Sequence, residues 1–156
     1  MPKETMHRTA SDNVYFHRDF HGALSASIDY LHETYGEESV REYLWQFAKA
    51  YYAPLTASLE SRGLVAIEEH FRKVYELEGG TVRFDLSEDE LRIEVDACPA
   101  VTHMRRQGYG VARLFRETTG TVNEAICDDT AYRAELVEYD DATGRSVQRF
   151  CRREQP

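Results

Sequence analysis

The chain has 156 residues, the length of one typical domain, and at that size folding buries about 70% of the surface that the unfolded chain exposes. A metal or disulfide scaffold is therefore not needed for stability. Hydrophobic residues make up 42% and charged residues 30%, as in soluble globular proteins. The 28 acidic residues outnumber the 19 basic ones, and the resulting net charge of −9 disfavours binding to nucleic acid.

Cysteine usage and the lack of long apolar runs indicate a cytoplasmic protein. Three cysteines (Cys98, Cys127 and Cys151) are too few and odd in number for a disulfide framework, which favours a reducing compartment. The first 22 residues contain no apolar region of the kind found in secretory signals. The longest uncharged stretch, Ala50 to Leu59, is too short to cross a bilayer, so no association with membranes is expected.

The first half of the chain is predicted to be helical, after a flexible tail over residues 1–10. Apolar residues recur at intervals of three and four in three segments, and a glycine follows each segment. The predicted helices run from Ser11 or Asp12 to Tyr35, from Glu38 to Arg62, and from Leu64 to Glu78. Pro54 lies inside the second helix and is expected to kink or break it.

The second half alternates between hairpins and helices. Period-two alternation predicts four strands, at Val82–Leu86, Leu91–Ala97, Tyr132–Tyr139 and Arg145–Arg152. Between the hairpins, Pro99 can open a short helix to Gln107, and a longer helix is expected over residues 111–128, although Gly120 lies within it. This order predicts one α+β domain over residues 11–153, with helices packed on a four-stranded antiparallel sheet.

The segment around Cys98 contains the strongest candidates for catalytic and substrate-binding side chains. Cys98 is expected at the N-cap of the short helix, where backbone N–H groups and the helix dipole favour the thiolate, and so a nucleophile or ligand. His103 lies about one turn later and can carry a proton, while Arg105 and Arg106 can hold a substrate carboxylate. The alternative is a buried free cysteine followed by a proline that only marks the end of the strand.

A second candidate is the histidine pair His17 and His21. The i, i+4 spacing places both on one helix face and suits two ligands of one metal. If Cys98 or His103 joins them, a mixed nitrogen and sulfur site for zinc or iron results. The alternative is a surface His17 beside a core His21.

Other polar residues favour packing roles. Tyr109 lies between two glycines, and it can contribute a hydroxyl to a substrate pocket at a mobile lip, or bury its ring at a packing seam. Cys127 is expected at the negative end of a helix, which does not activate a thiol. Cys151 alternates along the last strand, so both cysteines are interpreted as packing residues.

Four segments together resemble the L-2-amino-thiazoline-4-carboxylic acid hydrolase-like family over residues 15–153. They are Phe20–Leu24, Tyr35–Glu38, Cys98–Val101 and Tyr139–Gly144. The resemblance implies hydrolysis of a C–N or C–S bond in a small cyclic amidine-like carboxylate.

This activity can be accommodated by the candidate residues. A Cys98 thiolate would attack the ring carbon, His103 or His21 would protonate the leaving atom, and Arg105 or Arg106 would bind the carboxylate. In the alternative enzyme version, a metal held by His17, His21 and Cys98 supplies the hydroxide.

A hypothesis without catalysis also remains. The element order is similar to the 4-vinyl-reductase-type domain, a fold of vesicle-trafficking subunits and small-molecule sensors. A sensor or regulatory domain predicts an apolar pocket between helices and sheet, an uncleaved ligand and a homodimer through a helix face. A protein–protein adaptor is the third interpretation.

Overall fold

The computed structural model describes residue 18 and residues 20–154, and it confirms the predicted α+β fold. The helices are α1 (Phe20–Tyr35), α2 (Glu37–Tyr51), α3 (Ala53–Arg62), α4 (Leu64–Glu78), α5 (Pro99–Gln107) and α6 (Gly120–Cys127), with a 3₁₀-helix η2 (Phe115–Thr118). The strands are β1 (Val82–Leu86), β2 (Glu90–Val95), β3 (Tyr132–Tyr139) and β4 (Ser146–Arg152). Within the described residues, no helix has both the length and the apolar character needed to cross a membrane.

The helical first half largely follows the prediction. The first helix ends at Tyr35 as expected, whereas its predicted start at Ser11 or Asp12 and the predicted tail over 1–10 lie outside the described residues. The predicted break also occurs, because α2 ends at Tyr51 and α3 begins at Ala53. Pro54 lies in the first turn of α3, where backbone N–H groups make no hydrogen bond within the helix, so its lack of an N–H costs nothing there.

The predicted helix over residues 111–128 is wrong in its first part. Residues 111–114 are not helical, η2 is a separate short turn, and α6 begins only at Gly120. Tertiary contacts explain the difference: Ser25 Oγ donates a hydrogen bond to Gly110 O at 3.0 Å and accepts one from Ala112 N at 2.8 Å. This segment is therefore held against α1, and the local helical periodicity is overridden.

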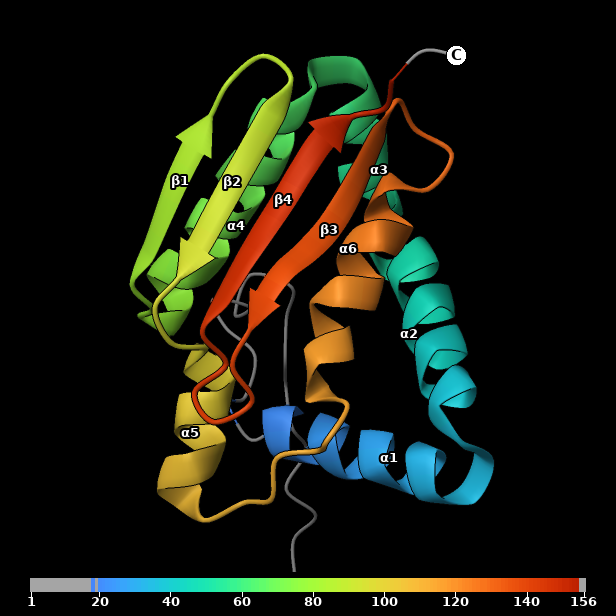
Figure 1. Ribbon diagram of the computed structural model, residues 1–156, viewed down its shortest axis with the longest axis vertical. Helices are drawn as coiled ribbons and strands as arrows, with labels where there is room; N and C mark the ends of the chain where they lie inside the picture. Colours follow the sequence, from blue (N-terminus) through green and yellow to red (C-terminus); the bar gives the residue numbers. More distant parts are fainter. Residues whose placement is uncertain (1–17, 19, 155–156) are drawn as a thin grey trace, which may run out of the picture.

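The sheet has the strand order β1-β2-β4-β3, with antiparallel pairing throughout. In Figure 1, α4 lies behind the sheet and α6 lies beside β3, and apolar residues of the strands share one buried core with apolar residues of both helices. Register places Leu91 of β2 opposite Phe150 of β4, and both side chains are fully buried. The core between sheet and helices thus depends on the two central strands.

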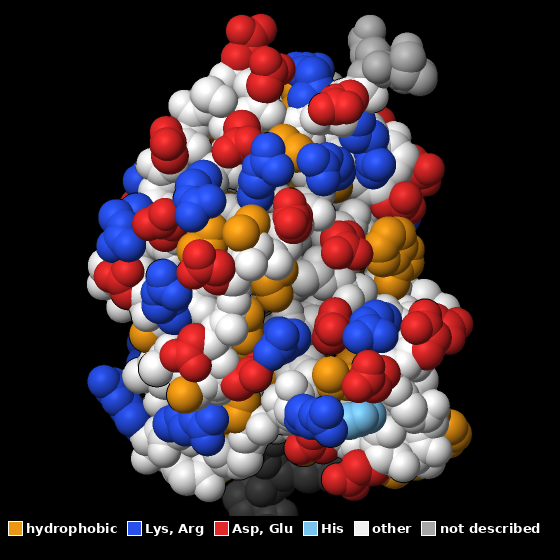
Figure 2. Space-filling view, in the orientation of Figure 1, with side chains coloured by type: hydrophobic (Ala, Val, Ile, Leu, Met, Phe, Trp, Pro, Cys, Tyr) orange, Lys and Arg blue, Asp and Glu red, His pale blue; other side chains and the backbone are white. Residues whose placement is uncertain are grey.

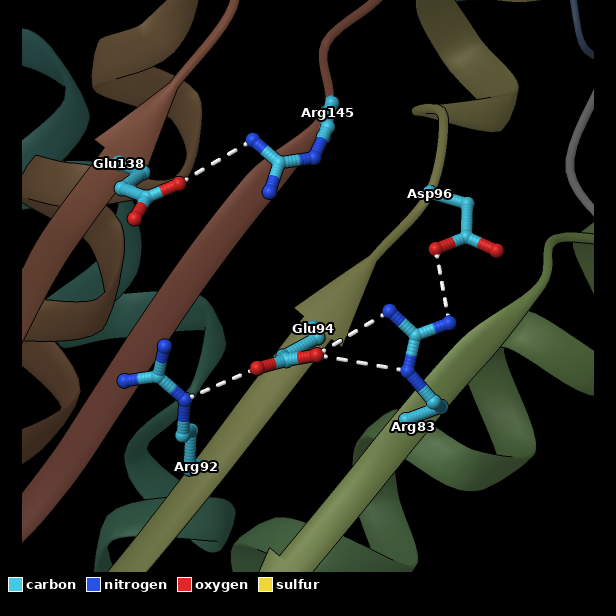
Figure 3. A network of polar contacts seen from close by, with 6 residues as sticks. All are labelled: Arg83, Arg92, Glu94, Asp96, Glu138 and Arg145. Atoms are coloured by element: carbon cyan, nitrogen blue, oxygen red, sulfur yellow. Dashed lines mark hydrogen bonds and ion pairs between the residues drawn. The ribbon is translucent and has the colours of Figure 1, made fainter.

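The opposite face of the sheet is charged. Lys, Arg, Asp and Glu side chains intermingle over it in Figure 2. Arg83 on β1 contacts Glu94 at 3.1 Å and Asp96 at 3.0 Å, and Arg92 contacts Glu94 at 3.0 Å (Figure 3). A second pair joins Arg145, the residue before β4, to Glu138 of β3 at 3.1 Å. Such exposed pairs add little stability, and they give the sheet one solvent-exposed face, as is common in antiparallel sheets.

Candidate functional site

A cleft of about 240 Å³ is lined by residues of α1, of α5 and of the end of α4. Figure 1 shows α1 and α5 at the same end of the molecule. The side chains that line the cleft include those of His21, Glu78, Asp96, Thr102, His103 and Arg106. Three of them, His21, His103 and Arg106, are site residues predicted from the sequence. The fold brings them to one cleft although α1 and α5 are far apart along the chain.

The α1 wall of the cleft is fixed by close packing on the segment after α5. A Cβ added to Gly22 would lie 2.9 Å from Cδ2 of Tyr109, so the helix backbone touches that ring. One turn later, buried Ser25 makes its two hydrogen bonds to Gly110 and Ala112. His21, at the start of the same helix, is thereby held at the cleft.

Tyr109 packs beside the cleft and is not among the residues that line it. Its ring lies edge-on to the ring of His103, with centroids 6.3 Å apart. Together with its contact to Gly22, this geometry favours the packing interpretation over the predicted role in substrate binding, since the ring joins α1 to α5.

The α4 wall contributes an acidic residue that sequence reasoning missed. Glu78 is the last residue of α4, and its Oε2 lies 3.6 Å from His21 Nε2. The side chains are only 12% and 15% exposed. Gly80 follows at a point where an added Cβ would meet the Pro99 ring at 2.8 Å, so the chain after α4 packs directly on the start of α5. Nothing in the sequence distinguishes Glu78 from the other 27 acidic residues.

The α5 wall presents one arginine to the cleft and turns the other away. Thr102, His103 and Arg106 line the cleft, whereas Ala100, Val101 and Met104 are buried on the opposite face of the helix. Neighbouring helical residues point about 100° apart, so Arg105 leaves the cleft and donates a long hydrogen bond of 3.4 Å to Asp141 O. Of the two predicted carboxylate-binding arginines, only Arg106 is at the cleft.

Cys98 occupies the predicted N-cap of α5, but its surroundings differ from the expectation. It is partly buried, and the neighbouring Ala97 and Pro99 line the cleft while Cys98 does not. The β3–β4 turn covers it: Cys98 N donates to Thr143 O at 3.0 Å, and a Cβ on Gly144 would lie 2.3 Å from Cys98 Cβ.

Burial raises the pKa of the Cys98 thiol, while the backbone N–H groups of Val101 and Ala100 act in the opposite direction. The expected lowering of its pKa is therefore wrong, because desolvation outweighs the stabilisation by the helix N-terminus. Whether Cys98 nevertheless takes part in chemistry stays a prediction, but the thiol is not activated in this arrangement.

The reactivity of Cys98 can be measured directly. In a variant with Cys127→Ser and Cys151→Ser, we expect iodoacetamide to modify Cys98 at least about tenfold more slowly at pH 8 than the same chain in denaturant, because a buried thiol with a raised pKa offers little accessible thiolate. Mass spectrometry over a time course gives the rate. If iodoacetamide modified the folded chain as fast as the denatured chain, Cys98 would again be a candidate for an activated nucleophile.

The predicted metal site receives no support from the part of the chain that the structure describes. Among these residues, no group of three or more His, Cys, Asp or Glu side chains is placed to hold a metal ion. His17 lies outside the described residues, so the proposed set of His17, His21 and Cys98 for zinc or iron is untested as a whole.

Cys127 and Cys151 are buried, and burial raises the pKa of Cys127 to about 12, consistent with the packing roles predicted for both.

A second, smaller cavity of about 70 Å³ lies between the helices and the sheet. Tyr52 and Tyr75 line it on one side, and Asn123 and Gln148, joined by a 2.8 Å hydrogen bond, line it on another. The sensor hypothesis predicts an apolar pocket in this position. The volume corresponds to about two water molecules and the lining is partly polar, so the larger cleft is the better candidate for a ligand.

Comparison with known proteins finds no protein-family model that matches the chain and no curated protein that matches it in sequence. The resemblance to the L-2-amino-thiazoline-4-carboxylic acid hydrolase-like family therefore stays a prediction.

Proposed function

We propose that the protein binds a small carboxylate in the cleft between α1, α4 and α5. The observation that carries this proposal is the convergence of His21, His103 and Arg106 on one cleft. A cavity of 150 Å³ accommodates benzene, so a cleft of about 240 Å³ suits a ligand of about ten non-hydrogen atoms. The ligand is thus expected to be a metabolite-sized molecule.

Arg106 is the group expected to bind the carboxylate. Its guanidinium lies at the cleft and makes no ion pair with any residue that the structure describes. A guanidinium can donate two parallel hydrogen bonds to a carboxylate, and such charge-assisted bonds are stronger than neutral ones. The hydroxyl of Thr102, four residues earlier on α5, lines the same cleft and can add a further hydrogen bond.

Arg106→Gln tests this proposal. Small carboxylates of up to about ten non-hydrogen atoms are screened by ligand-observed NMR, and the dissociation constants of those that bind are measured by titration. We expect Arg106→Gln to weaken binding by at least about tenfold, because a charge-assisted hydrogen bond is lost. Arg113→Gln, a change of an exposed arginine outside the cleft, is the control and should leave affinity unchanged. Equal affinity in the Arg106 variant would contradict the proposal.

Hydrolysis of the bound molecule is a second candidate, favoured by the His21–Glu78 pair. An imidazole beside a carboxylate can act as a general base, because the nearby negative charge stabilises the protonated form that arises when the base takes a proton. His21 would take a proton from water as the water oxygen forms a bond to the electron-poor carbon of the ligand. His103 would then give a proton to the nitrogen or sulfur atom as its bond to that carbon breaks.

This route uses no Cys98 thiolate and has its own test. The carboxylates that bind are incubated with the protein and examined by mass spectrometry for a product heavier by one water. His21→Asn should abolish that product while the ligand still binds. Recovery of every ligand unchanged would remove the hydrolase candidate and leave the binding function in place.

A further inference from the structure

We infer that Glu78 binds a protonated nitrogen of the ligand, so that the molecule recognised in the cleft is a zwitterion. This inference rests on the proposed carboxylate-binding function and adds a second point of recognition to it. It assigns a specificity-determining role to a residue that the sequence did not single out.

The first observation is the incomplete hydrogen bonding of the Glu78 carboxylate. Its side chain is only 12% exposed, and the contact to His21 Nε2 is 3.6 Å, longer than a hydrogen bond. No residue in the described part of the chain donates a hydrogen bond to either of its oxygens. Since a carboxylate taken out of water is stable only when it is paired or hydrogen-bonded, this group is suited to a cationic donor that enters the cleft.

The second observation is the position of Glu78 on its helix. It is the last residue of α4, where the unpaired carbonyl groups make a helix end negative and disfavour an anion. The following N–H groups do not compensate, because those of Gly79 and Gly80 both donate to Tyr75 O, at 2.8 and 3.2 Å. The local backbone therefore adds to the negative potential at this wall.

The effect of this charge extends to neighbouring groups. Burial is the main cause of the raised pKa values of the Cys98 thiol and the Tyr75 hydroxyl, and the negative charge of Glu78 raises both further. Both groups are therefore close enough to Glu78 to be affected by its charge. A cation at this wall is therefore favoured and an additional anion is disfavoured.

The other acidic residue at the cleft is already paired. Asp96 is bound by Arg83 from the neighbouring strand at 3.0 Å (Figure 3). Glu78, whose contact to His21 is longer than a hydrogen bond, is thus the acid with hydrogen-bonding capacity left for a ligand, while Arg18 and Arg106 are cations at the same cleft. A simple carboxylate would be attracted by Arg106 but repelled by Glu78. A simple protonated amine would be attracted by Glu78 but repelled by Arg106. A molecule with a carboxylate and a protonated amine can pair its carboxylate with Arg106 and its ammonium with Glu78.

Matched pairs of probes test this inference. Butanoate, pentanoate and hexanoate are compared with 4-aminobutanoate, 5-aminopentanoate and 6-aminohexanoate, which carry the same chain with a terminal ammonium and fit the volume of the cleft. Dissociation constants are measured by NMR titration. We expect at least one amino acid of the series to bind about tenfold more tightly than its amine-free partner.

Glu78→Gln should remove this difference, while Glu76→Gln, a change of an exposed residue on the same helix, should keep it. The amine-free probes are an internal control. They should bind Glu78→Gln at least as tightly as the unchanged protein, because a repelling charge is gone, whereas a variant with a damaged fold would lose both kinds of probe.

Two results would overturn the inference in distinguishable ways. If amine-free and amino probes bind the unchanged protein equally, and Arg106→Gln weakens both, Glu78 does not select a cation but the carboxylate-binding function stands. If no probe of either series binds, and the wider carboxylate screen also yields no ligand, the proposed function fails and the inference fails with it.

Discussion

Replacing Gly144 with alanine is expected to lower the free energy of unfolding by about 3 kcal/mol. Gly144 has φ +69°, a conformation that costs an alanine about 1 kcal/mol. The added Cβ would also lie 2.3 Å from Cys98 Cβ and 3.0 Å from Val101 Cγ2, so the turn and the start of α5 would have to separate. Denaturant unfolding followed by circular dichroism measures the change.

Gly108→Ala is the matched control for this prediction. Gly108 has a similar φ of +72°, but no atom lies within 4 Å of an added Cβ. Its replacement should therefore cost only the conformational strain, about 1 kcal/mol. Equal losses in the two variants would show that the contact between Gly144 and Cys98 is not tight, and the burial of the thiol would then need another explanation.

Replacing Ser25 with alanine is expected to cost about 2 kcal/mol of stability and to weaken ligand binding in the cleft. Ser25 is fully buried, and its hydroxyl is the partner of both the Gly110 carbonyl and the Ala112 N–H. Without it, two backbone groups lose their partner beneath α1. Because the same contacts hold α1 at the cleft, affinity for any probe bound near His21 should fall together with stability.

Ser27→Ala provides the comparison on the same helix. The Ser27 hydroxyl donates to Ala23 O at 2.9 Å within α1 and is exposed, so its loss should change stability by less than about 0.5 kcal/mol. If Ser25→Ala were equally neutral in denaturant unfolding, α1 would be held by its apolar contacts alone.

Most of the fold could be predicted because its determinants are local. Glycines after Tyr35, Arg62 and Glu78 end the helices where the apolar periodicity ends, and alternation marks each hairpin. The exception, residues 111–119, is instructive because its conformation is set by a hydroxyl on α1 that is distant in sequence. No local pattern contains that information.

The candidate site was predictable by residue type but not by environment. His21, His103 and Arg106 stand out because an imidazole can transfer a proton near neutral pH or bind a metal, and a guanidinium can bind a carboxylate. Glu78 does not stand out, because a carboxylate matters only where it is buried. Cys98 was placed correctly at its N-cap, yet its desolvation depends on the β3–β4 turn, some forty residues later.

The attachment of α1 has a consequence for how a bound ligand changes local opening of the fold. Parts of a protein can open separately from the rest, and α1 packs on α2 and α5 whereas β2 and β4 are each paired on both sides. Release of α1 would remove His21 from the cleft while β2 and β4 remained paired. A ligand that bridges the α1 wall and α5 is therefore expected to slow hydrogen exchange in α1 more than in the sheet.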